Sequence, residues 1–324
     1  MILVLFIGCA ADCERRGLAA GDDQRCRVEG WDDREVLVHV PASWDGTVAL
    51  PLVVARHGHS GTAANFDSST CDGGDEGGAA CLNTVADEEG FVVAYADGTG
   101  NAAGLSRSWN AGGGEDGWRC VGDPACEDGV DDVAYDDDLL SLLTGLLPID
   151  EARIFATGMS NGAAMSHRLA CERSDRYAAV AAVAGANQAS AAPGCAPTAA
   201  VPILQIHGTE DPCWGWDGSA EGVCEGGGDP YVSVDASMEF WRTANGCAET
   251  TSEEAVEDAA DDGMTTTHLR WDGCTAPVEL LRTENGGHTW PGGSQYLSAD
   301  IVGGVTGDYS ASRAVWAFFE GAAP

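Results

Sequence analysis

The chain has 324 residues, of which 44% are hydrophobic, enough for a packed core and too many for a disordered or fibrous protein. Its 52 acidic residues outnumber 16 basic residues, all of them arginines, so the formal net charge at pH 7 is −36. A chain this anionic repels phosphate groups, which makes nucleic acid a poor partner and argues against electrostatic docking to anionic lipid.

The first residues predict export. An apolar run over 1–7 is followed by Gly8-Cys9-Ala10, an arrangement that resembles a bacterial lipoprotein signal, in which the cysteine becomes the lipidated first residue. The alternative is an ordinary secretory signal, with Cys9 removed or paired. We therefore expect a signal peptide at 1–8, a polar tether at 9–27 and a single catalytic domain at 28–324. The expected location is extracellular, cell-surface or periplasmic, with a lipid on Cys9 as the membrane tether in the lipoprotein case.

The rest of the chain alternates between strand and helix patterns. Strands are expected at 35–40, 50–56, 91–96, 153–157, 177–184, 201–207, 265–271 and 277–282, and helices at 133–147, 161–172, 234–245 and 309–320. A long irregular stretch separates residues 97 and 129. Short apolar strands alternating with helices predict an α/β fold, a mostly parallel central sheet with helices on both faces.

Thirteen cysteines are scattered along the chain without a CxxC pair, so disulfides in an oxidising compartment are a better interpretation than a zinc site. Setting Cys9 aside leaves twelve, an even number. The spacings suggest local loops, although they do not determine connectivity: Cys71 with Cys81, Cys120 with Cys126, Cys213 with Cys224, Cys171 with Cys195, and Cys247 with Cys274. These pairs predict disulfide-tied loop insertions.

The sequence Gly158-Met-Ser160-Asn-Gly162 joins a predicted strand to a predicted helix. This pattern in this context is typical of a nucleophile elbow, in which glycines allow strand and helix to approach closely and the serine hydroxyl is exposed. Ser160 is therefore the candidate nucleophile.

A serine nucleophile requires a histidine base, and in α/β-hydrolases the chain order is serine, acid, histidine. Beyond the elbow helix, the candidates are His207 at the end of a buried strand, His268 within a polar strand, and His288. His288 lies in a glycine-rich loop between the last strand and the last helix. That position favours His288 as the base.

The carboxylate that orients the base should follow an earlier strand. Asp211 lies in the loop just after the strand at 201–207, with Glu210 and Asp217 as competitors. We expect Asp211 to be the acid.

An oxyanion needs backbone N–H donors. One is expected from Asn161, directly after the nucleophile, and the other from His59 in the glycine-rich turn at 57–61. The neighbouring His57 is expected to be a structural, hydrogen-bonding residue beneath this turn, and His167 to be buried behind the elbow.

Several motifs together resemble a known family. They are His57-Gly58-x-x-Gly61, Arg107-Ser-Trp109-Asn110, Asp131-Asp132-Val133, Gly158-Met-Ser160-Asn-Gly162, His207-Gly-Thr-x-Asp211 and Gly287-His288-Thr-Trp290-Pro-Gly. Over residues 35–319 the chain is similar to the secreted polyhydroxybutyrate depolymerase and feruloyl (acetylxylan) esterase family of α/β-hydrolases. The resemblance implies an α/β-hydrolase fold and ester hydrolysis through Ser160, Asp211 and His288. Longer cysteine-bearing loops at 67–81, 112–127 and 213–229 depart from the family pattern and bear on the substrate.

Tryptophans are expected near the carboxyl edge of the sheet, where ligands bind in such folds. Trp290, Trp109 and Trp216 are the candidate substrate-binding residues. The position of Trp290 beside the base favours a wall of the acyl or alcohol pocket, whereas Trp109 and Trp216 alternatively pack the disulfide loops onto the body. The acidic runs at 72–76, 127–138 and 253–262 lack the EF-hand pattern, so solvated surface is the preferred interpretation and no metal is assigned; Ca²⁺ binding by these runs is the alternative.

The sequence thus predicts a secreted serine esterase that needs no cofactor. The expected substrate is a neutral polymeric or oligomeric ester, of the polyhydroxybutyrate type, and a feruloyl or acetyl ester on plant polysaccharide is the alternative. A non-catalytic surface lipoprotein that binds through the same scaffold is a third possibility, against which the complete Ser160, Asp211 and His288 set argues.

Overall fold

A computed structural model describes residues 13, 17–31, 34–74, 77–100, 106–112, 124–191, 195–220 and 231–323. Its strands are β1 (Asp23–Arg27), β2 (Glu35–His39), β3 (Leu50–Arg56), β4 (Val92–Ala96), β5 (Ile149–Met159), β6 (Ala179–Val183), β7 (Ile203–Gly208), β8 (Thr251–Ala255), β9 (Thr265–Trp271) and β10 (Val278–Glu284). Its helices are α2 (Ala63–Ser69), α3 (Leu82–Glu89), α4 (Pro124–Glu127), α5 (Asp132–Leu146), α6 (Asn161–Glu172), α7 (Val234–Ala244), α8 (Ala299–Val302) and α9 (Ala311–Ala322), with 3₁₀ turns η1 (Asp72–Gly74) and η2 (Gln188–Ala191).

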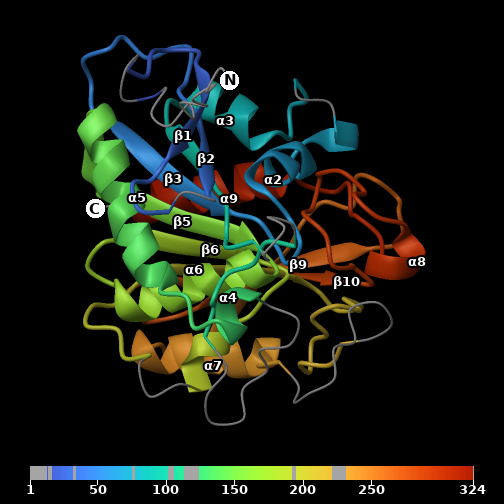
Figure 1. Ribbon diagram of the computed structural model, residues 1–324. Coiled ribbons are helices and arrows are strands. Elements are labelled where there is room, and N and C mark those ends of the chain that lie inside the picture. Colours follow the sequence, from blue (N-terminus) through green and yellow to red (C-terminus); the bar gives the residue numbers. More distant parts are fainter. Residues whose placement is uncertain are drawn as a thin grey trace.

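All the described strands form one sheet in the order β1-β2-β4-β3-β5-β6-β7-β10-β9-β8 (Figure 1). The six central strands run parallel to one another; they are β4, β3, β5, β6, β7 and β10. At the edges the pairing of neighbouring strands is antiparallel: β1 with β2, β2 with β4, β10 with β9, and β9 with β8. The predicted α/β fold with a mostly parallel sheet is confirmed.

The sheet separates two hydrophobic cores. Leu52 and Val54 of β3 contribute to the core that includes residues of α5, α6 and α7, whereas Val53 and Ala55 contribute to the core that includes residues of α2, α3 and α9. All seven residues of β3 are buried, because both faces of a parallel sheet are covered by helices. This double burial explains why the central strands have uninterrupted apolar sequences.

The segment expected to be a tether, 9–27, is partly incorporated into the sheet, and this corrects the prediction. β1 pairs antiparallel with β2, and the side chain of Cys26 is buried and bonded to Cys13. Most of β1 is polar and exposed, so neither an apolar run nor a clear alternation marked it in the sequence. Residues 1–8, with the expected signal peptide, and Cys9 lie outside the described residues.

Three predicted disulfides are confirmed: Cys71–Cys81, Cys171–Cys195 and Cys247–Cys274. Cys126 and Cys213 are also disulfide-bonded, while their expected partners, Cys120 and Cys224, lie outside the described residues.

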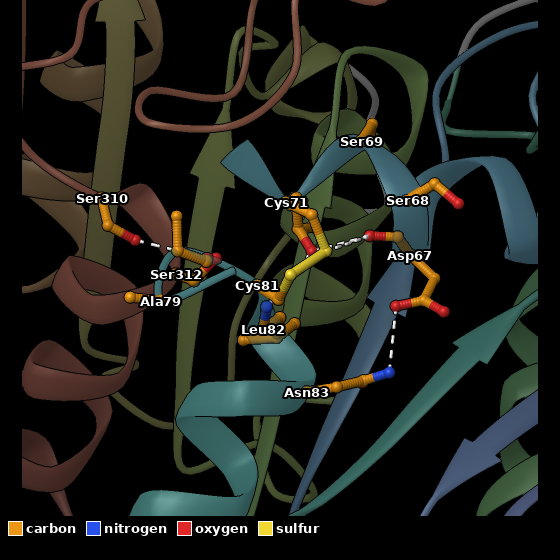
Figure 2. Close-up of a disulfide and its surroundings, with 12 residues drawn as sticks. Asp67, Ser68, Ser69, Cys71, Ala79, Cys81, Leu82, Asn83, Ser310 and Ser312 are labelled. Atoms are coloured by element: carbon orange, nitrogen blue, oxygen red, sulfur yellow. Dashed lines mark hydrogen bonds between the residues drawn. A yellow bond between two sulfur atoms is a disulfide. The ribbon is translucent and has the colours of Figure 1, made fainter. Parts of the chain in front are cut away.

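The Cys71–Cys81 disulfide joins the end of α2 to the start of α3. Figure 2 shows the side chains around it, including the hydrogen bond of 3.0 Å from Asn83 Nδ2 to Asp67 Oδ1, which also links the two helices. Ser310, just before α9, approaches the same loop through a hydrogen bond to Ala80 O. The disulfide and these hydrogen bonds together anchor a surface loop to α2, α3 and the start of α9. No helix among the described residues is long and apolar enough to cross a membrane.

Candidate active site

The turn between β5 and α6 has the geometry of a nucleophile elbow. Ser160 has φ 57° and ψ −122°, a strained conformation for a residue with a side chain. A Cβ on Gly162 would lie 2.2 Å from Arg56 O, and a Cβ on Gly158 would lie 2.6 Å from the Gly162 carbonyl carbon. Only glycine fits at these two positions, so the spacing seen in the sequence follows from the close approach of strand and helix.

Asp211 and His288 form a buried hydrogen-bonded pair. His288 Nδ1 lies 2.7 Å from Asp211 Oδ2, and both residues are 4% exposed. The two residues follow β7 and β10, which are parallel neighbours paired from Ile203 to Gly208. Because neighbouring parallel strands end at the same edge of the sheet, the topology brings together residues 77 positions apart.

The hydrogen bonds of this pair define its chemistry. Asp211 Oδ1 accepts the backbone N–H groups of Cys213 at 2.8 Å and Trp214 at 2.7 Å. Three N–H groups thus surround the carboxylate and hold it in one orientation. Since Nδ1 of His288 donates to Asp211, its Nε2 carries a lone pair that can accept a proton.

The competing carboxylates lie elsewhere. Glu210 and Asp217 are exposed, and Asp217 Oδ1 accepts the N–H of Ser219 at 2.9 Å. Of the three acidic side chains considered from the sequence, Asp211 alone is hydrogen-bonded to His288.

The turn after β3 packs directly against the elbow. A Cβ on Gly58 would lie 3.1 Å from Ser160 Cβ. His57 is buried beneath this turn, where its Nδ1 donates to Gly58 O at 2.7 Å and its Nε2 accepts the Gly98 N–H at 2.9 Å. Burial lowers the pKa of His57 to about 3, so the imidazole is neutral and shapes the turn that carries His59.

Asn161 links the elbow to the segment around Trp109. Its side-chain oxygen accepts the Trp109 N–H at 2.7 Å, and its amide nitrogen donates to Trp109 O at 3.0 Å. The indole of Trp109 is 1% exposed and donates to His57 O at 3.0 Å. Burial leaves no face of Trp109 for a substrate, so this side chain supports both turns from below.

The other candidate tryptophans differ in exposure. Trp290 is 1% exposed, and its Nε1 donates to Ser312 Oγ at 3.1 Å, so it too packs inside the protein. Trp216 is partly exposed, and its Nε1 donates to Asp235 Oδ1 at 3.0 Å. Neighbouring side chains decide this burial, and a loop sequence does not reveal them.

Sequence reasoning missed Tyr296 and Leu297, which are 41% and 47% exposed. The Tyr296 hydroxyl donates to His288 O at 3.0 Å, so this apolar pair lies on the loop that carries the candidate base. Ser294 N donates to Ser69 O at 3.0 Å, which connects the loop to the region of the Cys71–Cys81 disulfide, where Figure 2 labels Ser69. An aromatic and an aliphatic residue within a polar, glycine-rich loop were the available signal.

One group among the described residues, Asp211, Cys213 and His288, has the proximity of a metal site. The Cys213 sulfur is in a disulfide, and Asp211 and His288 are hydrogen-bonded to each other. The disulfide and the hydrogen bond occupy the Cys213 sulfur, His288 Nδ1 and Asp211 Oδ2, so these three residues together do not fit a metal ion.

Comparisons with known proteins place these features in context. A family described as phospholipase/carboxylesterase matches residues 137–216, from within α5 to the turn at residues 211–214, which carries Asp211 and is called the acid turn below. The chain is 29% identical over 265 residues to a Nocardia uniformis subsp. tsuyamanensis protein named as the esterase NocK, covering 78% of this chain and 69% of that protein. It is 29% identical over 216 residues to feruloyl esterase B of Piromyces equi, covering 66% of this chain and 36% of that protein.

Among solved structures, an acetyl xylan esterase from Aspergillus awamori superimposes with a TM-score of 0.52 at 15% identity, over 86% of this chain and 97% of that chain. At this identity the likeness concerns the fold, which is that of an α/β-hydrolase.

Proposed function

We propose that this chain, which is an α/β-hydrolase of the esterase type, is a secreted serine esterase with one catalytic domain that hydrolyses neutral carboxylic esters. The nucleophile is Ser160, the base His288 and the acid Asp211. The observation that carries the proposal is the buried hydrogen bond between His288 and Asp211, together with the strained elbow conformation of Ser160.

The mechanism is acyl transfer. His288 Nε2 takes the proton of Ser160 Oγ as this oxygen attacks the ester carbonyl, and Asp211 stabilises the resulting imidazolium. The N–H groups of His59 and Asn161 donate to the developing oxyanion. His288 returns the proton to the leaving alcohol, and water then attacks the acyl-enzyme by the same route to release the carboxylic acid.

Charge and exposed surface support a neutral, partly apolar substrate. The net charge of −36 disfavours anionic substrates, and the exposed pair of Tyr296 and Leu297 offers apolar contact next to the base loop. We propose a polyhydroxybutyrate-type polyester or its oligomers as the substrate. A feruloyl or acetyl ester of plant polysaccharide is the second candidate, favoured by the similarity to feruloyl esterase B and by the capacity of Tyr296 to stack on an aromatic acyl group.

The disulfides support secretion, because such bonds persist in oxidising compartments. A lipid on Cys9 remains the proposed tether for a cell-surface form.

The test is a substrate panel for the wild-type enzyme and Ser160→Ala: p-nitrophenyl acetate, butyrate and octanoate, methyl ferulate, and a polyhydroxybutyrate film. We expect film clearing and turnover of the soluble esters, both lost in Ser160→Ala. Turnover of ferulate or acetate without clearing would favour the plant-polysaccharide esterase. Absence of any Ser160-dependent turnover would contradict the proposed enzymatic function and favour the alternative of a non-catalytic binding protein.

A second comparison tests the apolar pair. Leu297→Ser should lower the ratio of octanoate to acetate turnover by about threefold to fivefold, because part of a leucine side chain no longer contacts the acyl chain. The matched control is Val48→Ser, which removes another exposed hydrophobic side chain, 58% exposed, in the connection between β2 and β3. An equal change of the ratio in both variants would contradict a specific contact with Leu297.

A further inference from the structure

A continuous chain of buried hydrogen bonds runs through the protein to the acid turn. Trp241 Nε1 of α7 donates to His167 Nδ1 of α6 at 3.1 Å, and His167 Nε2 lies 3.0 Å from Gln205 Oε1 of β7. Gln205 Nε2 lies 3.2 Å from His207 Nδ1, and His207 Nε2 lies 2.7 Å from Trp214 O. All five residues are less than 5% exposed.

The direction of this chain is determined at both ends. The indole N–H of Trp241 can only donate, and the carbonyl of Trp214 can only accept. Every group between them therefore has one possible role: His167 donates through Nε2, Gln205 accepts with its oxygen and donates with its nitrogen, and His207 donates through Nε2. Both imidazoles must be neutral, which agrees with burial, since burial lowers the pKa of His207 and lowers that of His167 to about 4.

The last donor in the chain faces the candidate acid. His207 Nε2 lies 3.5 Å from Asp211 Oδ2, the oxygen that accepts the hydrogen bond from His288. The same imidazole binds the carbonyl of Trp214, whose N–H donates to Asp211 Oδ1. His207 thus contacts the acid turn on both sides of the Asp211 carboxylate. Asp211 and His288 are the titratable groups that influence the pKa of His207.

The same hydrogen-bond chain also contacts the elbow that carries Ser160. Gln205 Nε2 donates to Gly185 O at 3.1 Å, and Gly185 packs so closely on the elbow that a Cβ there would lie 2.3 Å from Ser160 O. His167 lies on α6, the helix that starts directly after Ser160. One polar network therefore connects the elbow with the acid turn.

We infer that His207 is a positioning residue, which holds the turn of residues 211–214 so that the Asp211 carboxylate faces His288. The inference rests on the proposed function, because its consequence is the activity of the pair formed by Asp211 and His288. It assigns a role to a histidine that takes no part in proton transfer.

Two substitutions of His207 separate its two hydrogen bonds. His207→Gln places an amide N–H near the position of Nε2 and retains the bond to Trp214 O, whereas His207→Asn is too short to reach it. We expect His207→Asn to lower kcat about 30-fold to 100-fold with KM within about threefold, and His207→Gln to lower kcat only about fivefold. Equal losses in the two variants, or the reverse order, would overturn the inference.

The pH profile distinguishes positioning from a general loss of structure. A displaced Asp211 stabilises the imidazolium of His288 less, so the acidic limb of kcat/KM should move to lower pH in His207→Asn. A variant that is merely less stable would lose folded protein and keep the position of that limb. An unshifted limb in folded His207→Asn would contradict the inference.

His39→Gln is the matched control. His39 is also a buried histidine, 6% exposed, and it is hydrogen-bonded to Asp23 at the far edge of the sheet. The His39→Gln variant should retain the wild-type kcat and pH profile, measured per folded molecule. Ser160→Ala, measured in the same assays, separates the two hypotheses: a wild type without Ser160-dependent turnover defeats the proposed function, whereas an active wild type with an unchanged His207→Asn defeats this inference alone.

Discussion

Two turns of this protein have the same local sequence and are held in different ways. His57-Gly58 directly follows β3, and His207-Gly208 ends β7, both at the carboxyl ends of parallel strands. Both histidines are 1% exposed, and burial lowers the pKa of each. In each case a neutral imidazole donates to a backbone carbonyl of its own turn, Gly58 O or Trp214 O.

The acceptor side of the two imidazoles differs. His57 Nε2 accepts from the backbone N–H of Gly98, whereas His207 Nδ1 accepts from the side chain of Gln205, which in turn depends on His167 and Trp241. A backbone donor persists whatever side chains surround it. The turn at residues 57–61 that carries His59, here called the oxyanion turn, therefore does not depend on the side chains of Trp241, His167 and Gln205, although Trp109 also contacts it. In contrast, substitutions on α6 or α7 can perturb the acid turn through those side chains.

The largest expected effect comes from breaking the acid turn at its centre. Asp211→Asn should lower kcat by about 10⁴, because an amide favours the wrong tautomer of the base. The oxyanion turn remains intact, so affinity for a substrate analogue should change little. The control is Asp217→Asn, at an exposed carboxylate in the same loop. Loss of activity in Asp217→Asn with retention in Asp211→Asn would reverse the assignment of the acid.

Breaking the other turn should cost less. His57→Gln should lower kcat by about 10², because the turn that presents the His59 N–H loses its support and one oxyanion donor is worth on the order of 3 kcal/mol. Affinity for a boronic acid that mimics the tetrahedral intermediate should fall in parallel. Full affinity for the boronic acid in an inactive variant would exclude an effect through the oxyanion turn.

Coupling between substitutions sharpens the comparison. Gln205→Leu removes the donor to His207 and should lower kcat about tenfold. Added to His207→Asn it should cause little further loss, because both break the same chain, whereas with His57→Gln the two losses should multiply. Steady-state kinetics of the two double variants measure this directly. Strong coupling between Gln205→Leu and His57→Gln would show that the oxyanion turn also depends on this chain.

The smallest effect is on stability, and here the two turns should behave alike. His57 has a pKa of about 3 when folded, against about 6.5 when unfolded. Its contribution to the free energy of unfolding is fully present above pH 6.5 and is lost as the pH falls from 6.5 toward 3, by about 1.4 kcal/mol per pH unit. Urea unfolding between pH 5 and 6.5, with disulfides intact, should show a flatter pH dependence for both His57→Gln and His207→Gln. An unchanged slope in either variant would show that this histidine is not held neutral.

Short local motifs were sufficient to predict most of the candidate site. The strand-to-helix elbow at Ser160, the polar turn at Asp211 and the glycine-rich loop at His288 are each defined by a few consecutive residues, and the chain order of an α/β-hydrolase relates them. The central strands were equally clear, because double burial leaves an unbroken apolar run. The exposed edge strands β1 and β8 were missed, since polar strands at a sheet edge resemble loops in sequence.

The sequence by itself therefore determined the fold class and the candidate residues Ser160, Asp211 and His288. Only the tertiary structure decided that Trp109 and Trp290 are buried while Tyr296 and Leu297 are exposed. It alone revealed the role of His207, which in sequence is one more polar residue at the end of a buried strand. The physical reason is that burial and hydrogen-bond direction depend on partners far along the chain: His167 lies 74 positions from Trp241 and 38 from Gln205.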